Sequence, residues 1–129
     1  MSETAIWPSV RYTDAHAAIR FLVDAFGFER VAVYETGDRV DHAELRWPGG
    51  GGVMLGSASR EDSSIAGLPP GTGSVYVVTD DVDALFKRAC AAGATVVQEP
   101  RDESYGAGFT VRDPEGVFWS FGTYRGAGG

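Results

Sequence analysis

One pattern of apolar residues occurs twice in this chain, 67 residues apart, and it restricts the possible folds more than any other feature. The spacing i, i+3, i+4, i+7, i+8 is that of the buried stripe of an amphipathic helix. The first copy is Ala15, Ala18, Ile19, Leu22 and Val23, and the second is Val82, Leu85, Phe86, Ala89 and Cys90. A glycine follows each stripe, Gly27 and Gly93, and is expected to end the helix. The repetition predicts two copies of one structural unit.

Alternating segments around each stripe extend the repeat to strands. In the first half we predict strands at 6–12, 30–35, 40–47 and 53–56, and in the second at 74–78, 95–98, 108–112 and 117–123. The polar segment 57–73, with Pro69-Pro70-Gly71, has neither period and is the predicted linker. The expected architecture is α+β: two β-α-β-β-β modules (1–56 and 74–125) and a tail (126–129) in one structural domain. Their curved mixed sheets would form a cup with the helices outside.

Net charge and the distribution of apolar residues argue against several classes of function. A net charge of −7 and a pI near 4.7 argue against a nucleic-acid partner, which needs clustered Lys and Arg. No apolar run has the roughly 20 residues of a membrane span, and the N-terminus lacks the pattern of a signal peptide, so we expect a cytoplasmic protein. The single cysteine, Cys90, lies on the second stripe, where we expect it to pack in the core.

Three segments together resemble the vicinal oxygen chelate superfamily, which includes glyoxalase I, bleomycin-resistance proteins and extradiol dioxygenases. They are Val10-Arg11-Tyr12-Thr13-Asp14, Ala25-Phe26-Gly27-Phe28, and residues 105–121, in which the turn Asp113-Pro114-Glu115-Gly116 precedes an aromatic strand. The resemblance covers nearly the whole chain. It implies paired β-α-β-β-β modules, usually a homodimer, and a small-molecule ligand in the cup.

Metal-dependent members of that superfamily place one ligand on each of four strands. The resemblance assigns these positions to Trp7, Glu44, Ser74 and Ser120, of which only Glu44 can ligate as a carboxylate. His42, two residues away on the same face, could add a second ligand. A divalent ion needs several converging ligands, so we expect no metal and no other cofactor, with a divalent ion as the alternative.

Strand alternation then assigns the side chains that face the cup. They are Trp7, Ser9, Arg11, His42, Glu44, Arg46, Ser74, Tyr76, Phe118 and Ser120. The loop 99–108 is expected to be a mobile rim that carries Tyr105. Aromatic and charged groups together suit a small aromatic or cationic organic ligand. Arg11 or Arg46 could instead neutralise Glu44 by an ion pair.

Three functions follow from these residues. The first is a metal-free binding protein like the bleomycin-resistance branch. The second is an enzyme, lyase- or isomerase-type or dioxygenase-like, in which His42 and Glu44 are catalytic with or without a divalent metal. The third is a dimer with no ligand. The residues leave catalysis and sequestration as alternatives and do not name the ligand.

Overall fold

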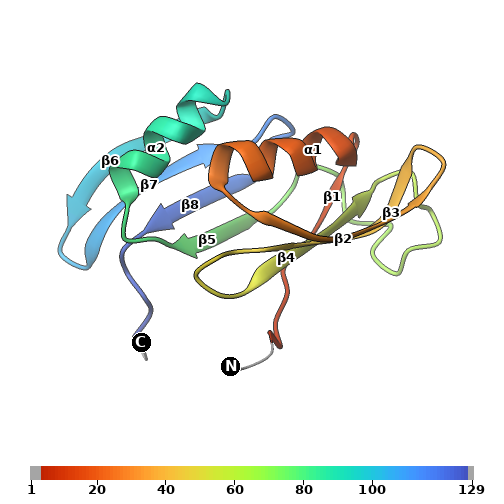
Figure 1. Cartoon of the computed structure of the whole chain (residues 1–129), viewed down its shortest axis with the longest axis horizontal. Coiled ribbons are helices and arrows are strands. Elements are labelled where there is room, and N and C mark those ends of the chain that lie inside the picture. Colours follow the sequence, from red (N-terminus) through yellow and green to blue (C-terminus); the bar gives the residue numbers. More distant parts are fainter. Residues whose placement is uncertain (1–3, 128–129) are drawn as a thin grey trace.

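Two modules with the same order of elements make up the structure, a computed structural model that describes residues 4–127 (Figure 1). The first contains β1 (Ser9–Tyr12), α1 (Ala15–Phe21), the π-helical turn η1 (Leu22–Phe26), β2 (Glu29–Thr36), β3 (Arg39–Arg46) and β4 (Gly52–Ser57). The second contains β5 (Ser74–Val78), α2 (Val82–Ala91), β6 (Thr95–Glu103), β7 (Gly106–Arg112) and β8 (Phe118–Gly122). No helix within these described residues is long and apolar enough to cross a bilayer.

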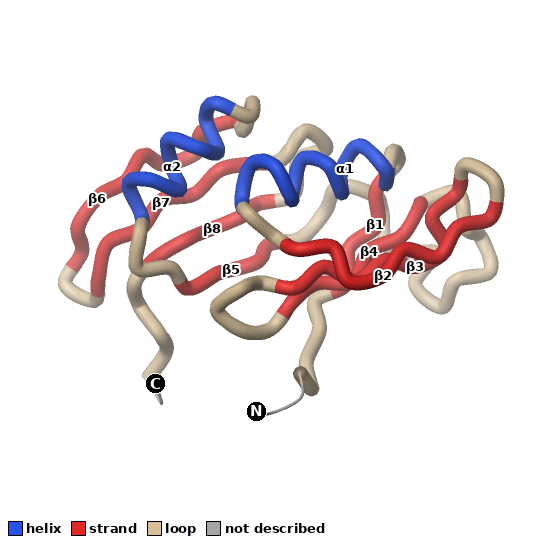
Figure 2. Tube along the Cα trace, in the orientation of Figure 1, coloured by secondary structure: helices blue, strands red, loops and turns tan. Residues whose placement is uncertain are grey.

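Each module forms its own four-stranded mixed sheet. Sheet A has the order β1-β4-β3-β2, and sheet B has the equivalent order β5-β8-β7-β6. In both sheets the first strand pairs in parallel with the last, and the other pairs are antiparallel. Both helices lie on one side of the two sheets (Figure 2). The predicted α+β fold, two β-α-β-β-β modules forming a cup with the helices outside, is confirmed.

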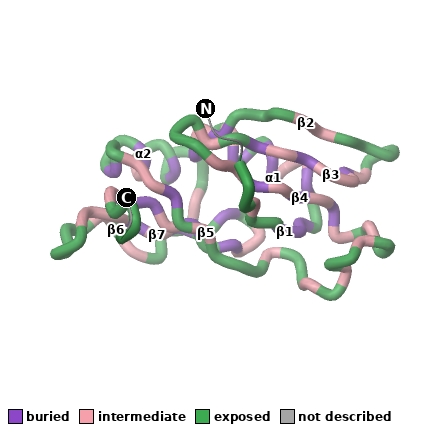
Figure 3. The backbone as a smooth tube through the Cα atoms, turned by 90° about the horizontal axis from the view of Figure 1, so that it is seen from below, coloured by how far each residue is buried: buried purple, intermediate pink, exposed green. Residues whose placement is uncertain are grey.

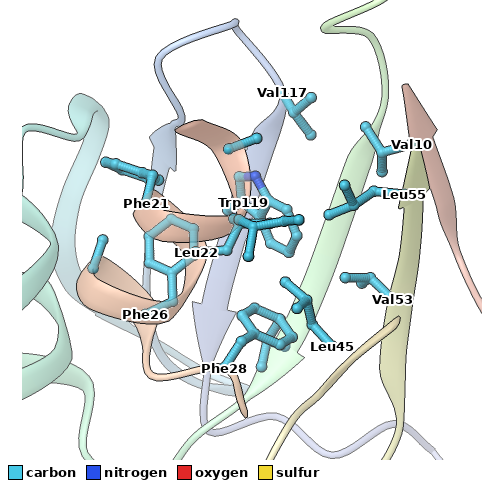
Figure 4. Packing of buried hydrophobic residues seen from close by; sticks show 14 of the residues in the cluster. Val10, Phe21, Leu22, Phe26, Phe28, Leu45, Val53, Leu55, Val117 and Trp119 are labelled. Carbon is cyan, nitrogen blue, oxygen red and sulfur yellow. The ribbon is translucent and has the colours of Figure 1, made fainter. Parts of the chain in front are cut away.

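The first helix belongs to the core of both modules. After Phe21 the helix widens into η1, and Gly27, with φ 90°, ends it. The Phe26 ring then lies 5.4 Å from the ring of Trp119 and 4.8 Å from that of Phe121, both on β8 (Figure 4). Because one apolar cluster extends through both modules, neither is expected to fold alone.

A buried carboxylate joins the modules at the turn before β8. Asp113 is 4% exposed, and its Oδ2 accepts from the Tyr12 hydroxyl at 2.6 Å and from the Trp119 indole at 3.0 Å. Its Oδ1 accepts from three backbone N–H groups of the same turn, at 3.0–3.1 Å. The Glu115 carboxylate accepts from the backbone N–H groups of Thr13 and Asp14, at the start of α1. The turn therefore fixes β1 and α1 of the first module against the second.

Three expectations about local structure were wrong. The first strand begins at Ser9 rather than Ile6, because Pro8 has no N–H to donate and only its carbonyl enters the ladder, accepting from the backbone N–H of Met54. Most of the predicted loop 99–108 belongs to the long β6–β7 hairpin. Cys90 is exposed, because the side of α2 that packs against its neighbours is the one with Val82, Leu85 and Ala89, and Cys90 lies beyond it.

Candidate functional site

The sheet faces opposite the helices carry most of the side chains that the sequence places in the cup. We call them the open face of sheet A and the open face of sheet B. Figure 3 views the molecule from this side, where exposed and half-buried segments run along the strands. On sheet A the strand register places Ser9, Met54 and Glu44 in one row across β1, β4 and β3. This row brings together residues that lie far apart in the sequence.

His42 and Glu44 form the most polar contact on the open face of sheet A. They lie two residues apart on β3, so their side chains leave the same face of the strand. His42 Nε2 is 2.8 Å from Glu44 Oε2, and both side chains are about one-third exposed. The Tyr34 ring stacks on the imidazole, with 6.1 Å between the centroids. An accessible imidazole–carboxylate pair can bind a polar group of a ligand or transfer a proton.

The alternative in which an arginine neutralises Glu44 was wrong. Arg46 forms its ion pair with Glu29 on the neighbouring strand β2. Arg11 is 6% exposed, and its guanidinium donates to the linker carbonyls of Ala58, Ala66 and Leu68 at 2.6–2.7 Å. The linker thus covers this end of β1, and Arg11 does not line an open cup.

The open face of sheet B carries aromatic and hydroxyl groups. The Phe118 ring is 40% exposed and lies 5.5 Å from the guanidinium carbon of Arg112. Ser120 is hydrogen-bonded to Thr110 at 2.8 Å, and Ser74 lies beside Phe118 in the parallel ladder. This face offers a half-exposed ring next to hydroxyl groups that can accept or donate.

Tyr76 lies across the end of the same face. Its ring packs over Gly122, so closely that a Cβ atom added at position 122 would lie only 2.7 Å from the tyrosine oxygen. The Tyr76 hydroxyl donates a hydrogen bond to the backbone carbonyl of Tyr124 at 2.7 Å. Burial raises the pKa of the Tyr76 hydroxyl. Tyr105, on the β6–β7 turn, is 64% exposed and meets the Tyr124 ring edge-on at 6.0 Å. Two of the predicted ligand contacts, Tyr76 and Tyr105, are therefore in contact with Tyr124, just after β8.

Trp7 also packs over a glycine, beside sheet A. Its half-buried ring packs over Gly52, where a Cβ would lie 2.7 Å from the ring, and its indole donates to the Thr4 carbonyl. Glycine at positions 52 and 122 thus leaves room for an aromatic ring on each sheet. A larger residue at position 122 would displace the Tyr76 ring. At position 52 it would also shift the backbone, because its Cβ would clash with the Leu45 carbonyl oxygen as well as with the Trp7 ring.

The side chains present do not fit a metal centre. Within residues 4–127, His, Cys, Asp and Glu nowhere gather in a group of three or more that could hold an ion. The repeat also relates Ser9 to Tyr76, and these pair with Met54 and Ser120 respectively, so Met54 rather than Glu44 is the equivalent of Ser120. His42 and Glu44 can supply two ligands from one strand, fewer than the several converging ligands that a divalent ion needs.

A cleft of about 860 Å³ lies between the modules, and we call it the seam cleft. One wall is the β3–β4 turn with the aromatic residues Phe28 and Trp47, and the other is β5 with the ion pair Asp80–Arg125. Sequence reasoning missed this cleft, because Trp47, Val75 and Val77 belong to the apolar sides of their strands. The run of four glycines at 49–52 was its only visible signal.

Known proteins resemble the chain over nearly its whole length. Residues 5–121 match the Glyoxalase/Bleomycin resistance protein/Dioxygenase superfamily. The uncharacterised protein Rv0887c of Mycobacterium tuberculosis (strain ATCC 25618 / H37Rv) is 37% identical over 130 residues, 93% of this chain and 74% of that protein.

Two solved structures extend the comparison. The structure of TioX from Micromonospora sp. ML1 has a TM-score of 0.80 and 31% identity, and the match covers 96% of this chain and 99% of TioX. TnmS3, an antibiotic-binding protein from Streptomyces sp. CB03234, has a TM-score of 0.72, and at 24% identity and 95% coverage of each chain it shows the shared fold. Fold, repeat and sequence agree: the chain belongs to the glyoxalase/bleomycin resistance protein/dioxygenase superfamily.

Proposed function

We propose that this protein binds a small aromatic or cationic organic molecule in the cup, without a metal ion or other cofactor. The observation that carries the proposal is the composition of the open faces, which present half-exposed aromatic rings beside charged and hydroxyl groups. Sheet A contributes Trp7, Tyr34, His42 and Glu44, and sheet B contributes Tyr76, Phe118 and Ser120. TnmS3, which shares this fold, is an antibiotic-binding protein, and this supports the same class of role here.

The chemistry of these groups selects the ligand class. Aromatic rings stack on planar molecules and attract cations through their π faces. Glu44 adds a carboxylate on sheet A, and the net charge of −7 favours the approach of a cation. On sheet B, Arg112 already lies against the Phe118 ring, so that ring can take part in a cation–π contact.

We further propose a homodimer in the cytoplasm. Half-exposed aromatic residues on the open side, such as Tyr76 and Phe118, would be partly covered by a second copy or by the ligand. Sedimentation velocity at micromolar concentration should give twice the mass of the chain. A monomer at 100 μM would refute the dimer.

Calorimetric titration tests the binding function. The probes are planar cations (ethidium, acridine orange), uncharged aromatic amines and bleomycin, each added to metal-free protein. We expect micromolar binding of at least one probe and a loss of about tenfold or more for Phe118→Ala or Tyr34→Ala, because a stacked ring and its buried area are removed. Ile65→Ala, in the linker, is the control and should bind as the wild type does. No binding tighter than millimolar across the panel would refute the proposal.

The contact between His42 and Glu44 supports a second function, proton transfer in a lyase- or isomerase-type reaction on a small carbonyl or epoxide substrate. The imidazole would move the proton, and the carboxylate would orient the ring. Here His42→Ala and Glu44→Gln should each abolish turnover while the protein stays folded. Full activity of both variants, with or without added Ni, Zn, Mn or Fe, would exclude the catalytic role.

A further inference from the structure

The seam cleft meets β5 along the edge of the strand rather than over its face. Four consecutive residues of β5, Val75 to Val78, line the cleft. Successive side chains of a strand point to opposite faces, so a pocket on one face would be lined by alternate residues. Lining by consecutive residues means that the backbone of β5 faces the cleft.

On this edge of β5 the backbone N–H and C=O of Tyr76 and the N–H of Val78 have no hydrogen-bond partner among the described residues. β5 is the terminal strand of sheet B, and within the described part of the chain it pairs with β8 alone. The Gly73 carbonyl accepts from the Phe118 N–H and the Thr79 N–H donates to the Gly122 carbonyl, so the odd-numbered residues of this strand bond to β8. By alternation, the backbone groups of Val75 and Val77 also face β8, and those of Tyr76 and Val78 point the other way. The Val78 carbonyl accepts from the Trp47 indole across the cleft at 3.2 Å, which confirms the direction.

The rest of the cleft is apolar and ends in an ion pair. Phe28, Trp47 and Pro48 line it together with the glycine turn. Arg125 and Asp80 pair at 2.7 Å beside β5, both well exposed. The volume of about 860 Å³ lies within the roughly 300–1,000 Å³ of small-molecule sites. A ligand here would meet donors and acceptors on one side and aromatic surface on the other.

We propose that the seam cleft binds molecules with an extended amide backbone, such as peptide-type small molecules, by strand addition to the free edge of β5. The ligand would exchange N–H···O hydrogen bonds with the backbone of Tyr76 and accept one from the Val78 N–H, since the Val78 carbonyl is already bound by Trp47. Its apolar groups would lie against Phe28 and Trp47. The inference rests on the proposed small-molecule binding and names one ligand class and its location. The open faces remain a separate surface for rings and cations.

The probe is the capped peptide acetyl-Val-Ser-Val-Ser-Val-amide with two N-methylated isomers, one methylated on the valines and the other on the serines. In an extended peptide the N–H groups of valines and serines point to opposite edges, so one isomer loses the groups that face β5 and the other keeps them. We expect the parent peptide to slow hydrogen exchange of the Tyr76 and Val78 amides. One isomer should bind about tenfold more weakly or worse, and the other should match the parent peptide.

A matched pair of variants tests the strand edge from the protein side. Val78→Pro removes an outward N–H while leaving the ladder to β8 intact, and edge positions tolerate proline. Val78→Ala shortens the side chain but keeps the N–H. The proline variant should bind the peptide about threefold to tenfold more weakly than the alanine variant. The N-methyl series tests the same contact in the wild type, so a misfolded proline variant would not remove the test.

Three outcomes would overturn the inference: no protection of Tyr76 and Val78 by the peptide, equal binding of both isomers, or protection in the free protein that grows with protein concentration. The last would show that a second copy occupies the edge. Phe118→Ala separates this site from the open faces, because it should weaken binding of a planar cation and leave peptide binding unchanged. Peptide binding without any dye binding would retain the cleft and refute the proposed role of the open faces.

Discussion

Replacing Asp113 by asparagine removes one charge from the most densely hydrogen-bonded group described in the structure. The carboxylate accepts five hydrogen bonds at 2.6–3.1 Å and is 4% exposed. The amide has the same shape but only one acceptor oxygen. If that oxygen stays toward the three backbone donors, the amide N–H₂ group faces Tyr12 and Trp119. The tyrosine hydroxyl can rotate and accept, but the indole N–H cannot.

The expected loss of stability follows from these contacts. A hydrogen bond to a buried charged group contributes roughly 1.5–3 kcal/mol, and a buried donor left without an acceptor costs roughly 1–3 kcal/mol. One lost bond and weaker remaining bonds give about 2–4 kcal/mol for Asp113→Asn. That is a large part of the roughly 5–15 kcal/mol that holds a domain folded.

Urea denaturation followed by tryptophan fluorescence measures this loss. Tyr12→Phe should cost about 1.5–3 kcal/mol, because it removes one of the five bonds to this charged group and little volume. The double variant should be less destabilised than the sum of the single variants, by at least about 0.5 kcal/mol, because the two groups share a bond. Asp38→Asn, in an exposed turn, is the control and should stay within about 0.5 kcal/mol of the wild type. A loss below about 1 kcal/mol for Asp113→Asn, or strict additivity with Tyr12→Phe, would refute the reasoning.

Three further predictions concern the linker, the acid stability and the open face of sheet B. Arg11→Met removes three hydrogen bonds to linker carbonyls, so trypsin should cut the linker faster than in the wild type, and equal cleavage rates would argue against this anchor. The Thr36 hydroxyl, followed by Arg39, lowers the pKa of Asp41, so this carboxylate stabilises the fold above its unfolded pKa of about 3.9, and the gain is lost as the pH falls through the lower folded pKa. Asp41→Asn should therefore shift the urea midpoint at pH 6 but not at pH 2, and an equal shift at both would contradict the assignment. Gly122→Ala should displace the Tyr76 ring and bring the pKa of its hydroxyl down toward the ordinary 10.0, as read from the ultraviolet titration of the tyrosines, whereas an unchanged titration would mean that the ring stays in place.

The elements of the fold could be predicted from the sequence because their signals are local. The 67-residue repeat of helical stripes and the alternation in residues 40–47 and 74–78 depend on neighbours a few residues apart. The errors came where distant parts decide the outcome. Cys90 continues a helical stripe, yet whether that side of the helix is covered depends on what packs against α2.

Side-chain partners on the cup were less predictable. Alternation put His42 and Glu44 on one face of β3, and the structure pairs them, but it cannot say which arginine reaches that carboxylate. Arg11 binds linker carbonyls 47 to 57 residues away, and Arg46 binds Glu29 through the β2–β3 register. Such partners depend on the path of the chain and on the strand register, and the residues next to each arginine in the sequence do not reveal either one.

The sequence by itself determined two modules of the same order and the apolar stripe of each helix, because periodicity is a property of the chain. Only the tertiary structure decided that the linker covers Arg11, that Asp113 joins the modules, and that a cleft exposes the edge of β5. The physical reason is that burial and hydrogen-bond partners depend on how the two modules pack together, and no single segment contains that information.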